Sequence, residues 1–74
     1  MMYVNERLVT STVVDALGRN GALYLDDLYK SVHKMHSAME KGAFEEVLML
    51  MELQGLIRVY KMPRGKKKAE LTKG

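Results

Sequence analysis

The segment LIRVYKMPRGKKKAELT, residues 56–72, decides the fold because its pattern predicts two strands joined by a turn. Its first half, residues 56–62, is rich in β-branched and aromatic residues, which favour strands. Residues 69–72, AELT, alternate apolar and polar side chains as a half-buried strand does. Pro63 and Gly65 between the two halves are turn residues. The sequence therefore predicts a β-hairpin whose basic loop, PRGKKK, is held at both ends by strand pairing.

The charge of the chain is concentrated in this hairpin. Residues 1–57 contain five cations and eight acids, a net charge of −3, whereas residues 58–74 contain seven cations and one acid, a net charge of +6. Such a separation is typical of a surface that meets a polyanion or an acidic partner. The alternative is a solvated basic turn that serves solubility alone.

The residues before the hairpin predict three helices and a short strand. The first helix is expected at 6–18, with Asn5 as its N-cap and the GRNG segment at its end. ALYL, residues 22–25, is expected to be extended, and a second helix at 26–36 begins with Asp26 as its cap. A third helix is expected at 40–54, closed by Gly55.

Apolar residues at helical spacing mark the expected core of one domain over residues 1–74. The expected core residues are Leu8, Val9, Val13, Ala16 and Leu17, then Leu28, Val32 and Met35, and finally Phe44, Val47, Leu48, Met51 and Leu53. The chain has seven methionines, which either fill gaps in this core or form an adaptable groove for a partner.

The order helix, short strand, helix, helix, hairpin resembles the winged helix-turn-helix family of DNA-binding domains. LMELQGLIRVYKMPRGKKKAELT, residues 50–72, is similar to the family's sequence at the end of the recognition helix and the two-stranded wing. The resemblance covers residues 5–73 and implies an α+β fold, mainly α, with a C-terminal wing hairpin at 56–72. It implies that the 40–54 helix enters the major groove and that the wing, residues 62–68, contacts the DNA backbone or minor groove.

The 40–54 helix lacks the side chains that a base-reading helix needs. Its exposed side is expected to carry Glu45, Glu46, Met49 and Glu52, with Lys41 as its only cation. Carboxylates repel phosphates, and base edges are read by Arg, Lys, Asn or Gln. We therefore expect binding to the phosphate backbone with little base readout. The residues expected to contact nucleic acid are Arg64, Lys66, Lys67 and Lys68, with Arg58, Lys61 and Lys41 at the margin.

These features predict a small protein that binds double-stranded DNA, either a transcriptional regulator or a chromatin-like architectural protein. Four phosphate contacts would give a log–log salt slope of about −3.6. RNA remains an alternative ligand. The alternative class is a protein-interaction winged helix, in which the acidic, Met- and Leu-rich 40–54 helix docks a partner. A homodimer is also expected, and the residues assigned to its interface or to a partner are Met49, Leu50, Glu45, Glu46, Tyr3 and Val4.

Other functions find no support in the residue pattern. The chain has no cysteine, and His33 and His36 lack the further ligands of a first-row metal site, so no metal or cofactor is expected. No catalytic arrangement, small-molecule substrate or membrane segment is expected, and the expected location is cytoplasmic. The tyrosines Tyr24, Tyr29 and Tyr60 are expected to pack with a solvated hydroxyl, the alternative being platforms on which bases stack.

Overall fold

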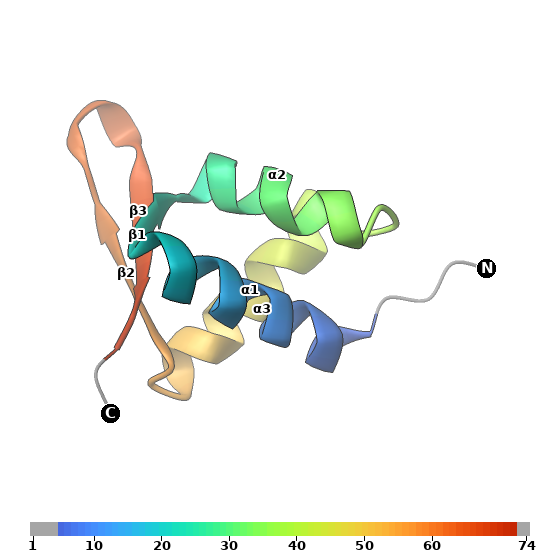
Figure 1. The fold of residues 1–74 in the computed structure, drawn as a ribbon. Helices are drawn as coiled ribbons and strands as arrows, with labels where there is room; N and C mark the ends of the chain where they lie inside the picture. The colour runs from blue at the N-terminus through green and yellow to red at the C-terminus, as the bar shows by residue number, and fades with distance from the viewer. Residues whose placement is uncertain (1–4, 73–74) are drawn as a thin grey trace.

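The computed structural model describes residues 5–72 and has an α+β fold that is mainly helical (Figure 1). Three helices and a three-stranded antiparallel sheet are present. The sequence predicts the helices, the hairpin and a short strand, but not the pairing of that strand with the hairpin. In chain order the elements are α1 (Glu6–Asn20), β1 (Ala22–Tyr24), α2 (Leu25–Met35), α3 (Lys41–Leu53), β2 (Ile57–Lys61), a 3-10 turn (Pro63–Gly65) and β3 (Lys67–Leu71).

Strand β3, the last element of the chain, is the central strand of the sheet. The strand order is β1-β3-β2, so β3 pairs with β1 along one edge and with β2 along the other. Ala69 lies opposite both Leu23 and Val59 and is fully buried. The short strand predicted at residues 22–25 therefore pairs with a strand at the opposite end of the sequence. A local sequence pattern does not specify this pairing.

All three helices cover the same face of the sheet, as Figure 1 shows with the strands at the left and the helices to their right. The core between the two layers contains residues from every helix and from strands β2 and β3: Val9, Val13, Ala16, Leu17, Leu28, Val32, Met39, Phe44, Val47, Leu48, Met51, Ile57 and Ala69. Every buried side chain in residues 5–72 is apolar. The polar and charged groups available for function therefore lie on the surface.

A glycine turn at the end of α3 directs the chain into the sheet. Gly55 has a φ of 76°, the left-handed conformation that glycine adopts without a steric penalty. Its N–H donates to the Glu52 carbonyl at 3.0 Å, and the Leu56 N–H donates to the Met51 carbonyl at 2.9 Å. This pair of hydrogen bonds is the Schellman motif, which satisfies the last helical carbonyls and reverses the chain. It lets β2 start only a few residues after α3 ends.

The boundaries of all three helices differ from the prediction, and α3 (Lys41–Leu53) is one residue shorter at each end than expected. Asn5 caps α1 as expected, accepting the Arg7 and Leu8 N–H groups, but α1 continues through Asn20 to Gly21. Gly21 ends the helix because its φ is 82°. The N-cap of α2 is Tyr24 instead of Asp26, and the Asp26 side chain lies in the first turn, where it complements the helix dipole.

Three residues assigned to the core are exposed, and three that were not assigned are buried, namely Met39, Ile57 and Ala69. Leu53 is 78% exposed because it lies about half a turn away from the Phe44 face of α3. Met35 and Leu8 lie near helix ends and are also exposed. Met39, in the loop before α3, is buried instead, and its carbonyl accepts a hydrogen bond from the Tyr29 hydroxyl at 3.1 Å.

Phe44 is the largest fully buried side chain, so shortening it tests this packing. Phe44→Ala should lower the free energy of unfolding by about 3–5 kcal/mol through lost burial and a cavity. Urea unfolding followed by circular dichroism measures the change. Met49→Ala is the matched control on the same helix, and its effect should stay within about 0.5 kcal/mol because Met49 is exposed. Equal losses in the two variants would contradict the assigned faces of α3.

Candidate nucleic-acid interface

The wing is an ordered turn between two paired strands. Pairing of β2 with β3 extends to the Lys61–Lys67 pair. Beyond that pair the Met62 N–H donates to the Lys66 carbonyl at 2.7 Å, and residues 63–65 form a 3-10 turn. The basic loop therefore has a defined backbone, and its charges are held in fixed positions relative to the sheet.

Arg64 occupies an unfavourable backbone conformation at the end of the wing. Its φ is 67° and its ψ is 27°, and the next residue, Gly65, also has a positive φ of 73°. Arg64 is the only non-glycine residue with a positive φ in the described part of the chain. For a residue with a side chain this conformation costs about 1–2 kcal/mol, whereas glycine adopts it freely. The turn itself would form more readily with glycine at this position.

The consecutive lysines of the wing hairpin do not form one patch, because side chains alternate between the two faces of a strand. We call the face that carries the core residues Ile57 and Ala69 the inner face, and the opposite face the outer face. Lys61 and Lys67 share the inner face with these residues by their register, beyond the end of the core. On the outer face lie Arg58, Tyr60, Lys68 and Glu70, together with Tyr24 from β1. The continuous basic run in the sequence is therefore divided in space.

The inner-face lysines form an unfavourable pair. Lys61 and Lys67 lie directly opposite each other on β2 and β3, where like charges destabilise the sheet. Within residues 5–72 no acidic side chain forms a salt bridge with either lysine, nor with Arg64, Lys66 or Lys68. The wing hairpin thus presents five cations that form no salt bridge within the described chain.

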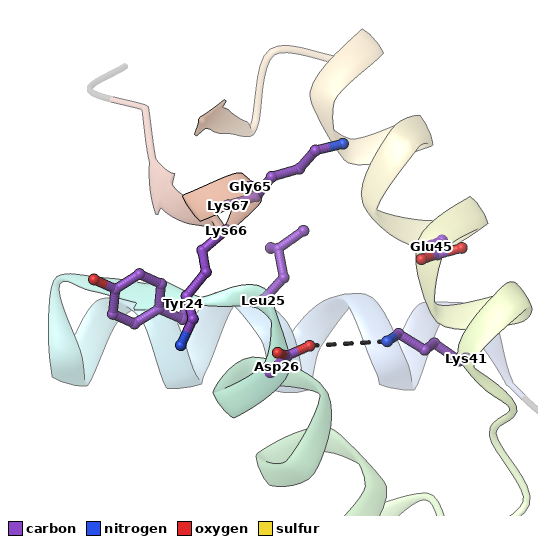
Figure 2. A pocket seen from close by; sticks show the side chains of 8 residues that line it. All are labelled: Tyr24, Leu25, Asp26, Lys41, Glu45, Gly65, Lys66 and Lys67. Carbon is purple, nitrogen blue, oxygen red and sulfur yellow. Dashed lines mark ion pairs between the residues drawn. The ribbon is translucent and has the colours of Figure 1, made fainter. Parts of the chain in front are cut away.

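A groove separates the wing from the helices, and its charges are mixed. Figure 2 shows this groove, of about 240 Å³, between Lys66 and Lys67 of the wing hairpin and the first turns of α2 and α3. In this view Lys66 extends toward Tyr24, whereas Lys67 extends away from it. Asp26 and Glu45 add negative charge to the lining, which makes the groove itself a weaker anion site than the wing.

Two of the three cations expected at the margin of the site lie beside acids. The Lys41 Nζ is 3.8 Å from the Asp26 carboxylate, and the Arg58 guanidinium is 3.9 Å from that of Glu70. Because all four groups are at least partly exposed, these pairs add little to stability. They do reduce the positive potential available to a phosphate, so Lys41 and Arg58 are weaker candidates than the wing cations.

The residues expected at a partner interface are divided between two surfaces. Glu45 lines the groove beside the wing, whereas Leu50 lines a second groove, of about 380 Å³, between α3 and the first half of α1. Met49 and Glu46 are exposed on α3, and Leu53, which was not assigned to an interface, adds apolar surface there. Tyr3 and Val4 lie outside the described residues.

The histidines and tyrosines have separate environments. The His36 Nε2 lies 2.9 Å from the Thr12 hydroxyl, and the His33 ring packs against Tyr29 with 5.5 Å between centroids. Tyr29 also packs on Phe44. β-Sheet alternation places Tyr24 and Tyr60, both half-buried, on the outer face of the sheet, away from the core.

Neither a metal cluster nor a membrane-spanning helix is present between Asn5 and Thr72. No three His, Asp or Glu side chains of this segment gather closely enough to hold a metal ion. None of its helices has the length and apolar character needed to cross a bilayer.

Comparison of the chain with protein-family models, with curated proteins and with solved structures finds no match.

The strain at Arg64 is open to a direct test. Arg64→Gly should raise the free energy of unfolding by about 0.5–1 kcal/mol, since glycine removes the steric penalty but adds entropy to the unfolded chain. Arg64→Ala removes the same charge and keeps the penalty, so it should leave stability nearly unchanged. Urea midpoints of the two variants and the parent protein provide the measurement. Identical midpoints for the Gly and Ala variants would contradict a strained Arg64.

Proposed function

We propose that the chain is a winged helix-turn-helix domain that binds double-stranded DNA through its wing, as a transcriptional regulator or an architectural protein. The element order and the C-terminal hairpin support this class. The observation that carries the proposal is the cost to stability at the end of the wing hairpin. There, the like-charged Lys61–Lys67 pair and the left-handed Arg64 are both unfavourable in the free protein.

A phosphate backbone would relieve the electrostatic part of this cost. An anion placed between Lys61 and Lys67 replaces their mutual repulsion with two attractive interactions. Arg64 at the turn can contact a second phosphate, because its guanidinium offers paired donors that match phosphate oxygens. These residues stabilise the free hairpin poorly, and their chemistry suits a polyanion.

The proposed contact uses phosphates and carries little sequence information. Helix α3, which would face the major groove in such a domain, exposes Glu45, Glu46 and Glu52, and its one cation, Lys41, lies beside Asp26. These carboxylates disfavour close approach of the helix to DNA. Because the wing lysines lie on two faces, one duplex meets Arg64 and the lysines of a single face. We therefore expect about three phosphate contacts and a salt slope of about −2.7, less steep than the slope for four contacts.

The duplex is assigned to the inner face, and the double variant Lys61→Ala/Lys67→Ala tests that assignment. Its log–log salt slope should be about 1.8 units less steep than that of the parent protein, since two phosphate contacts are lost. Affinity should fall alike for unrelated duplex sequences because phosphates are common to all of them. Mobility-shift or anisotropy titrations over a range of salt concentrations provide the measurement.

Arg7→Ala/Lys34→Ala is the matched control for this variant. It removes the same charge from exposed positions on α1 and α2, and neither residue forms a salt bridge within the described chain. Its salt slope should equal that of the parent. A slope that changes equally in both double variants would show a net-charge effect and would overturn the proposed wing contact.

A second candidate function, self-association or partner docking through α3, is favoured by the exposed apolar residues of that helix. Met49 and Leu53 are one turn apart, are 55% and 78% exposed, and lie on the side of α3 that faces away from the core. Leu50 beside them lines the groove against α1. A homodimer would remove this apolar surface from water.

Sedimentation velocity at high protein concentration tests the dimer. The parent protein should sediment as a dimer, and Met49→Ser/Leu53→Ser should shift it to monomer because the apolar contact is lost. The control is Met35→Ser, which alters an equally exposed apolar residue on α2 and should leave the dimer intact. A parent protein that remains monomeric would contradict this candidate.

A further inference from the structure

The outer face of the sheet combines tyrosines and cations in one row across three strands. Tyr24 on β1 and Tyr60 on β2 both pair with Lys68 on the central strand. The next row consists of Ala22, Glu70 and Arg58. The three helices pack on the opposite face, so no described helix covers these rows (Figure 1).

Tyr24 brings two lysines together on this face. The Lys68 Nζ lies 4.7 Å and the Lys66 Nζ 5.4 Å from the centre of the Tyr24 ring, distances that allow cation–π attraction. In Figure 2 the Lys66 side chain is directed to Tyr24 and away from the Lys67 side chain. The Tyr24 ring therefore gathers a pair of ammonium groups beside β3, where both can meet phosphate oxygens.

Tyr60 is on the other side of Lys68 and has a different role. Its side chain is half-buried on an uncovered sheet face, so part of the aromatic surface is open to solvent. Adjacent strands are about 4.8 Å apart. A nucleotide whose base stacks on Tyr60 can therefore place its phosphate within reach of the Lys68 ammonium. An aromatic ring beside ordered cations is the arrangement with which proteins hold single strands.

We propose that the outer face binds single-stranded nucleic acid, with one base stacked on Tyr60 and the adjacent phosphates on Lys66 and Lys68. Duplex DNA is a poor ligand for such a site, because its bases are paired and stacked and their faces cannot reach Tyr60. The inference goes beyond the proposed duplex contact, which uses Arg64 and the inner-face lysines. Single-stranded DNA and RNA both offer a free base face and a phosphate, and this chemistry is what the site recognises.

Anisotropy titrations with labelled oligothymidylate, oligouridylate and a duplex test the proposal on the full chain. Tyr60→Thr should weaken binding to single strands by about tenfold, the contribution of one stacked base, and should leave duplex affinity unchanged. Tyr60→Phe retains the ring and should bind single strands as tightly as the parent. Lys66→Ala/Lys68→Ala should make the single-strand salt slope about 1.4 units less steep, whereas Lys61→Ala/Lys67→Ala, of equal charge, should not.

Thermal melting of each variant verifies that the fold is retained. Equal single-strand affinity of the parent and Tyr60→Thr would overturn the proposal, as would an equal loss in Tyr60→Phe and Tyr60→Thr. An equal loss of duplex affinity in Tyr60→Thr would also overturn it.

Tyr60-dependent binding of single strands by a chain that binds no duplex would support this inference and overturn the proposed function. Equal affinity for the DNA and RNA oligonucleotides would indicate recognition of base and phosphate, and a preference for RNA would add a contact to the 2′-hydroxyl.

Discussion

The structure depends on the position of β3 between β1 and β2. Both edges of this strand are paired, and Ala69 at its centre is buried between Leu23 and Val59. Pairing on both sides fixes the register of the hairpin, because a slip of one residue would move Ala69 and Leu71 off the core face. The fixed register in turn determines which cations lie on each face of the sheet. Pairing with β1 adds a third strand to the hairpin, whose inner face also packs against the helices.

The same constraint explains why the residues that stabilise the hairpin and the residues proposed to bind DNA lie at different ends of it. Near the helices, inner-face positions hold Ile57, Val59 and Ala69, which contribute to the core. Farther out the same face holds Lys61 and Lys67, which gain no burial and repel each other. Arg64 adds a backbone penalty at the turn. The unfavourable terms are confined to the part of the sheet that extends past the core, so a small domain can tolerate them.

Charge also distinguishes the surfaces of the helices from that of the sheet. The core of the described chain contains no polar side chain, so all charge lies outside it. Helix α3 carries three exposed carboxylates, whereas five of the hairpin cations form no salt bridge within the described residues. A polyanion is therefore attracted to the hairpin and repelled from much of α3. This distribution of charge supports contacts with the nucleic-acid backbone in both proposed modes of binding.

The sequence alone determined the helices, the hairpin and the concentration of positive charge in the last quarter of the chain. Local signals suffice for these features, because helical periodicity, glycine turns and β-forming residues act over short distances. Two of its errors were non-local: Met35 has no neighbour to cover it, and Met39 is covered by packing that its loop does not predict. Leu53 was a local error, since helical periodicity already places it about half a turn from Phe44. Only the tertiary structure decided that β1 pairs with the last strand, and strand pairing on both edges of β3 places Tyr24 and Tyr60 beside Lys68. Strand pairing joins residues far apart in the chain, and side-chain alternation then separates neighbours that the sequence presents as one basic run.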